Sequence, residues 1–99
     1  MASFRLTAKA KADLRAIGRY TQKTWGREQR NRYLALLDGS FRDLANNPWK
    51  GRSCDDIRPG YRKLPVGRHL IFYRQAEDAI AIIRILHERM DIETHLAEE

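Results

Sequence analysis

The sequence has little cysteine and no long apolar run. Its single cysteine, Cys54, has no partner for an internal disulfide and does not suggest a metal site. No apolar stretch approaches the roughly 18 residues that a membrane-spanning helix needs. Residues 1–14 hold no apolar core of the signal-peptide type. These absences predict a cytoplasmic protein.

Familiar catalytic and cofactor motifs are also missing. The sequence has no P-loop, no Rossmann glycine pattern, no serine-nucleophile motif, no HExxH motif and no zinc quartet. The adjacent Asp55 and Asp56 are flanked by arginines in a loop, which favours ion pairing or loop capping over catalysis. We therefore expect no cofactor, no metal and no catalytic residue.

The basic charge is concentrated in the first half of the chain. The 99 residues predict a single domain, 1–99, with one core. Residues 1–53 carry 12 Lys and Arg against 4 Asp and Glu, whereas residues 54–99 carry 7 against 9. Such asymmetry indicates an acidic partner, either nucleic acid or an acidic peptide. The alternative is a basic protein that its lysines keep soluble.

Two helices follow from the spacing of apolar residues. Steps of three and four indicate helices over 8–25 and 27–46, with Thr7 as the N-cap of the first. Gly26 separates them by so short a connector that they should pack as an antiparallel hairpin. Pro48 ends the second helix, because proline disfavours helical geometry in the residue before it.

Strand-like segments lie on both sides of these helices. A short one covers 3–6, and three more, at 61–66, 68–75 and 79–87, are joined by short turns, which predicts an antiparallel meander. Residues 90–99 are either a short helix or a mobile tail. The prediction is a two-layer α+β fold in the order β-α-α-β-β-β, with the helix hairpin packed on a small antiparallel sheet.

A basic stripe runs along the first helix. Lys11, Arg15, Arg19 and Lys23 are four residues apart and so share one helix face, where like charges repel. An acidic partner would offset this repulsion, and the alternative is a solvated face. The patch continues in Arg27, Arg30 and Arg32. This patch could contact the phosphates of duplex DNA or RNA without reading their sequence. No helix-turn-helix, zinc-finger or RNA-recognition signature accompanies the patch.

Two of the three histidines should meet at one end of the sheet. His69 begins the middle strand of the meander and His87 ends the last one, so antiparallel pairing places them side by side near Arg68 and Arg89. Imidazoles beside arginines should have a lowered pKa and would suit acid–base chemistry on RNA. The alternative is a hydrogen-bonded polar cluster at the strand ends.

The last strand raises the question of what covers the outer face of the sheet. In its segment AIAIIRIL, apolar residues occupy both faces, and we expect Arg84 to mark the outer one. A partly apolar outer face is typical of a protein-binding surface. The alternative is that the C-terminal segment covers it.

The segments NNPWKGRSCDDIRPGYRKLPVGRHLIFYR and IIRILHERMD, together with the element order, resemble the ParE branch of the RelE/ParE toxin superfamily. The resemblance covers nearly the whole chain and implies that the first strand lies beside the last in one antiparallel sheet. It also implies a bacterial type II toxin that acts on DNA gyrase, traps it on cleaved DNA and blocks replication. A ParD-like antitoxin would neutralise the toxin by wrapping around its hairpin and sheet, in a hetero-oligomer.

The RelE branch, which cuts mRNA on the ribosome, is the alternative. This sequence places His69 where that branch typically has an arginine, and it lacks the branch's C-terminal tyrosine after Arg89. Both departures argue against ribonuclease activity.

Charge and strand-end position suggest two binding surfaces. For the target we predict contacts from Arg58, Arg62, Arg68, His69, His87 and Arg89. For the antitoxin we predict contacts from Lys11, Arg15, Arg19, Arg74 and Arg84.

Overall fold

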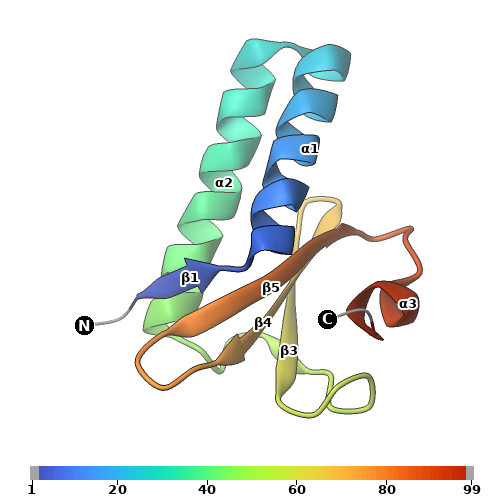
Figure 1. Cartoon of the computed structure of the whole chain (residues 1–99). Helices are drawn as coiled ribbons and strands as arrows, with labels where there is room; N and C mark the ends of the chain where they lie inside the picture. Colours follow the sequence, from blue (N-terminus) through green and yellow to red (C-terminus); the bar gives the residue numbers. More distant parts are fainter. Residues whose placement is uncertain (1–2, 98–99) are drawn as a thin grey trace.

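The computed structural model describes residues 3–97 and confirms the α+β fold (Figure 1). A hairpin of two long helices packs on one side of a five-stranded sheet, and a short helix packs on the other. No helix within 3–97 is long and apolar enough to cross a membrane. In chain order the elements are β1 (Phe4–Leu6), α1 (Ala8–Trp25), α2 (Arg27–Asn46), β2 (Arg52–Ser53), β3 (Tyr61–Val66), β4 (His69–Gln75), β5 (Ile80–His87) and α3 (Ile92–Ala97).

Both long helices have the predicted bounds. The Ala10 backbone N–H donates to Thr7 Oγ1 at 3.0 Å, so Thr7 is the N-cap of α1. Gly26 alone separates α1 from α2, and its φ of 96° lies in the region that favours glycine. Its backbone N–H donates to Gln22 O at 2.9 Å, which closes the end of α1 as the chain reverses.

The sheet is mixed, which corrects the expectation of a purely antiparallel one. Its strand order is β1-β5-β4-β3-β2, and β1 lies beside β5 as the resemblance implies, but parallel to it, with Phe4 opposite Ile80. The helix hairpin brings the chain back beside β1 (Figure 1). The strands β3, β4 and β5 then alternate in direction, so the third of them runs the same way as β1. The strand β2, at the other edge, lies where we expected a loop.

A β-bulge in β5 changes which residues face the helices. Phe72 of β4 pairs with Arg84, but the next residue, Tyr73, pairs with Ile82, so Ile83 is the extra residue. Ile82 and Ile85 therefore both join the core cluster under the hairpin. This explains why AIAIIRIL is apolar on both parities.

The outer face of the sheet is covered, so the expectation of an open apolar surface there is wrong. Leu96 of α3 is fully buried in a second core cluster with Phe72, Ile83 and Leu86. The alternative, a covering C-terminal segment, is correct; of the expected segment 90–99, residues 98 and 99 lie outside the described residues. Short helices gain most of their stability from such packing.

Arg84 does not mark the outer face. Its guanidinium Nε and Nη2 donate to the two carboxylate oxygens of Asp13 in α1, at 2.8 and 2.9 Å. The Ile85 backbone N–H also donates to Asp13, at 2.9 Å. This corrects our placement of Arg84: at the bulge, its side chain turns from the sheet toward α1, where the carboxylate compensates its charge.

We predict that Asp13→Asn lowers the free energy of unfolding by about 3 kcal/mol, because it removes the carboxylate beside a mostly buried guanidinium. The side chains of this pair are only 12% and 14% exposed. Urea denaturation of the purified protein measures the change. Asp38→Asn is the matched control, since the Asp38–Arg42 pair is exposed and should contribute less than about 1 kcal/mol. Equal losses in the two variants would contradict the prediction.

Candidate functional site

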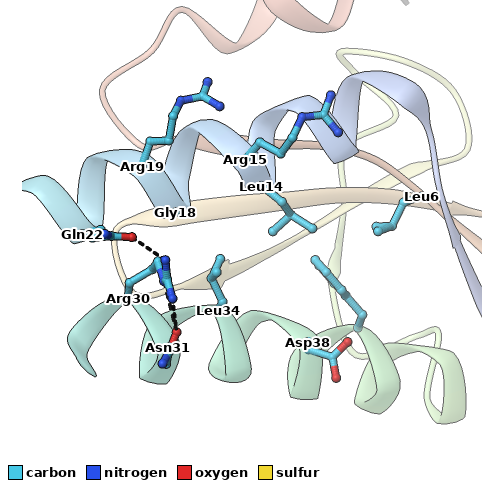
Figure 2. A pocket seen from close by; sticks show the side chains of 11 residues that line it. Leu6, Leu14, Arg15, Gly18, Arg19, Gln22, Arg30, Asn31, Leu34 and Asp38 are labelled. Carbon is cyan, nitrogen blue, oxygen red and sulfur yellow. Dashed lines mark hydrogen bonds between the residues drawn. The ribbon is translucent and has the colours of Figure 1, made fainter. Parts of the chain in front are cut away.

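A groove of about 560 Å³ runs between the two long helices (Figure 2). Leu14 of α1 and Leu34 of α2 point into the space between the helices, whereas Arg15 and Arg19 stand on its outer rim. Arg30 reaches across from α2 and donates to Gln22 of α1. The groove therefore combines an apolar floor with a basic rim. The residues lining it are Leu6, Leu14, Arg15, Gly18, Arg19, Gln22, Arg30, Asn31, Leu34, Asp38 and Phe41.

The basic stripe of α1 is exposed along its whole length. Of its four members, Arg15 and Arg19 line the groove, whereas Lys11 and Lys23 do not. This geometry suits an amphipathic segment that sets apolar side chains between the helices and carboxylates against the rim.

The sheet end near His69 and His87 forms a second candidate surface. The two histidines are direct partners across β4 and β5, as predicted, with ring centroids 5.3 Å apart. Tyr33 of α2 joins them, because its hydroxyl lies 2.6 Å from His69 Nδ1. The Arg89 backbone N–H donates to His87 Nδ1 at 3.1 Å.

Sequence reasoning did not identify Tyr33 as part of this cluster. It was one apolar position among several on α2, and only the docking of the hairpin brings its hydroxyl to the sheet. The turn residue Gly67 makes room for it: a Cβ at Gly67 would lie 2.7 Å from Tyr33 Oη, and the φ of 57° also favours glycine. The Arg68 backbone N–H donates to the same hydroxyl at 3.3 Å.

Burial controls the electrostatics of this cluster. It lowers the pKa of His69, an effect that nearby His87 reinforces and that Asp13 and Glu88 partly oppose. The direction agrees with our prediction, but the causes do not, since no arginine contributes. Burial also raises the pKa of Tyr33. A neutral His69 held by a tyrosine hydroxyl is a hydrogen-bonding group or a weak base at neutral pH.

The predicted target surface divides into two parts. Arg68, His69, His87 and Arg89 gather at the sheet end described above. Arg62 pairs with Tyr73 near the start of β3, four residues or about 13 Å along the strand from the residue opposite His69.

Arg58 contacts the short helix α3, which covers the outer face of the sheet. Its guanidinium donates to the Leu96 carbonyl of α3 at 3.0 Å and lies 5.6 Å from the ring centroid of Tyr61.

The predicted antitoxin contacts are also spread over the molecule. Lys11, Arg15 and Arg19 share α1, whereas Arg74 lies toward the far end of β4, where it pairs with Tyr61 of β3. Arg84 is paired with Asp13 beneath α1. Only the α1 residues thus form one continuous surface.

The remaining candidates have structural roles. Asp55 accepts a hydrogen bond from the Gly60 backbone N–H at 2.7 Å, which lowers its pKa, so the predicted loop capping is correct. Cys54 is buried, and burial raises its pKa, which is unfavourable for a nucleophile. Within 3–97 no three His, Cys, Asp or Glu side chains gather as they would around a metal ion.

Residues 4–92 match the profile of a family described as ParE toxin of type II toxin-antitoxin system, parDE. The chain belongs to the ParE toxin family. Toxin ParE1 of Mycobacterium tuberculosis is 45% identical to it over 92 residues, which are 92% of this chain and 94% of that toxin. Toxin ParE of Escherichia coli is 39% identical over 100 residues, covering 99% of this chain and 96% of the relative.

Solved structures agree with this ParE-family fold. The chromosomal ParDE toxin–antitoxin system of P. aeruginosa contains a chain with a TM-score of 0.76 and 26% identity, covering 88% of this chain and 96% of that one. The toxin–antitoxin complex RelBE2 of Mycobacterium tuberculosis shares the fold at a TM-score of 0.65 and 22% identity, with 87% and 96% covered. The resemblance noted in the sequence is therefore correct at the level of family and fold.

We predict that His69 makes this toxin less stable in mild acid. Its pKa in the folded state lies below the ordinary value of 6.5, so the unfolded chain binds more protons as the pH falls. The free energy of unfolding should therefore decline from about pH 6.5 down to the folded-state pKa. Urea denaturation across this range measures the decline, and His69→Asn should reduce it. An NMR titration midpoint of His69 above 6.5 would contradict the prediction.

Proposed function

We propose that this ParE-family toxin binds DNA gyrase, holds it on cleaved DNA and so blocks replication. The match of nearly the whole chain to ParE toxins carries this proposal. The sheet-end cluster of Tyr33, Arg68, His69, His87 and Arg89 supports it as a recognition surface, because hydrogen bonds and strand register hold the side chains of Tyr33, His69 and His87 beside the two arginines. In this proposal the toxin acts by binding an enzyme and performs no chemistry itself.

The proposal includes a ParD-like antitoxin that neutralises the toxin by occupying the groove between α1 and α2. Leu14 and Leu34 would receive the apolar face of an amphipathic segment, and Arg15 and Arg19 its carboxylates. Solved relatives described as toxin–antitoxin assemblies support this partner. The antitoxin would also relieve the repulsion between Arg15 and Arg19 on α1.

Ribosome-dependent cleavage of mRNA is the second candidate function. One observation favours it: two adjacent imidazoles, His69 and His87, lie near Arg68 and Arg89. Acid–base cleavage needs one protonated and one neutral group, and cationic side chains would hold the phosphate. The substitution of His69 for the arginine of the RelE branch weighs against this function.

Purified gyrase tests the leading proposal directly. Toxin, gyrase and supercoiled plasmid are incubated and then treated with detergent and protease, and we expect linear plasmid that is absent without toxin. Toxin mixed beforehand with the antitoxin should give none, and Arg68→Ala with His87→Ala should give less. Unchanged plasmid at high toxin concentration would contradict the gyrase proposal, and mRNA cleavage on ribosomes would then be the test of the alternative.

Charge reversal tests the antitoxin groove. We expect Arg15→Glu with Arg19→Glu to weaken antitoxin binding by about 100-fold, since each change puts a like charge against a carboxylate. Titration calorimetry at fixed salt measures the affinity. Lys23→Glu with Arg27→Glu is the matched control, because it changes the net charge equally but lies outside the residues that line the groove. An equal loss in both pairs would point to general charge attraction and against the groove.

A further inference from the structure

The loop between α2 and β2 carries an exposed tryptophan that belongs to neither core cluster. Trp49 is 66% exposed, although tryptophan is among the residues that gain most from burial. The other exposed tryptophan, Trp25, ends α1 at the far tip of the hairpin. Trp49 lies instead beside the edge strand β2, next to backbone that the structure holds rigidly.

Buried groups fix the backbone on both sides of Trp49. The hydroxyl of Tyr73, a fully buried residue, donates to the Pro48 carbonyl at 2.8 Å and accepts from the Gly51 backbone N–H at 2.9 Å. Gly51 itself leaves no space for a side chain, since a Cβ would lie 2.7 Å from the Lys63 carbonyl oxygen. The loop is therefore set by the core beneath it.

Arg62 fixes the indole as well as the loop. Its Nε donates to the Gly51 carbonyl at 3.0 Å, and its Nη2 reaches the Trp49 carbonyl at 3.3 Å. The guanidinium also lies 5.2 Å from the centroid of the Trp49 ring, in cation–π contact. The guanidinium thus lies over one face of the indole, and the rest of the ring remains exposed.

The surface around this ring is positively charged. Arg52 and Lys63 stand directly opposite each other on β2 and β3, an arrangement of like charges that is unfavourable across strands. In the part of the chain that the structure describes, neither forms an ion pair with a carboxylate. Arg62 donates to backbone carbonyls and forms no ion pair with a carboxylate among the described residues, although the charge of Asp55 acts on it from nearby. A partner that places carboxylates against this surface would relieve the repulsion between Arg52 and Lys63.

We propose that Trp49 is the anchor by which this toxin binds its target protein, in an apolar pocket bordered by carboxylates on gyrase. A preset aromatic side chain loses little conformational freedom on binding, and tryptophan is prominent among residues that dominate protein interfaces. The loop shares no residue with the groove between α1 and α2, so it lies outside the groove proposed for the antitoxin. This inference rests on the proposed gyrase function.

Substitution at Trp49 tests the anchor, with Trp25→Ala as the matched control at 70% exposure. We expect Trp49→Ala to weaken binding to purified gyrase at least tenfold, while the melting temperature and the antitoxin affinity stay unchanged. Trp25→Ala should alter gyrase binding less than twofold. In a Trp25→Phe background, the emission of Trp49 should shift to shorter wavelength on gyrase binding, as the indole leaves water.

Tyr73→Phe tests whether gyrase binding needs the loop backbone around Trp49 to be held in place, in addition to the indole itself. This variant keeps Trp49 but removes the hydroxyl that holds Pro48 and Gly51, so gyrase affinity should fall although the ring remains. It is measured well below its melting temperature, with circular dichroism to verify folding. Faster depolarisation of Trp49 fluorescence in the Trp25→Phe background would report the freed loop.

Three results would overturn the anchor. If wild-type toxin binds gyrase and Trp49→Ala binds it equally well, the anchor is wrong and the gyrase proposal stands. If wild-type toxin does not bind gyrase, the proposed function fails and the anchor fails with it. If a single-stranded oligothymidylate quenches Trp49 fluorescence at the concentrations at which gyrase binds, the surface is a base-stacking site for nucleic acid instead.

Discussion

The attachment of α1 to the edge of β5 determines where the groove and the sheet-end cluster of this toxin lie. The strand β1 pairs with β5 only as far as Ile82, so the rest of that edge needs other hydrogen-bond partners. Thr7 Oγ1 donates to the Ile83 carbonyl at 2.8 Å, and Asp13 accepts the Ile85 backbone N–H. Because unpaired buried backbone groups are costly, these two side chains fix the first turns of α1 over the sheet.

Two consequences follow from this attachment. With α1 fixed, α2 packs beside it and leaves the groove on the side of the hairpin where Leu14 and Leu34 meet. The same packing places Tyr33 of α2 against His69, so the helix layer contributes directly to the cluster at the sheet end. The exposed Trp49 depends on a different support, the Tyr73 hydroxyl rising from the middle of the sheet. The molecule thus separates a groove, a sheet-end cluster and a rigid loop.

Much of the fold was predictable because its signals are local. The helix bounds follow from apolar spacing, Thr7 and Gly26, and the pairing of His69 with His87 follows from the short turn between β4 and β5. The errors concern relations between distant segments. The parallel direction of β1, the bulge at Ile83 and the turn of Arg84 toward Asp13 depend on how the hairpin meets the sheet.

The sequence by itself determined the family, through segments that resemble ParE toxins. It also determined the order of elements and the basic stripe of α1, since periodicity and turn chemistry act between residues near each other in the chain. Only the tertiary structure decided which charged residues remain available to bind a partner. Arg84 is held by a carboxylate 71 positions away, and Arg62 and Tyr73 set Trp49 from strands that follow it in the chain. Such contacts arise from the packing of whole layers, so no short stretch of sequence contains them.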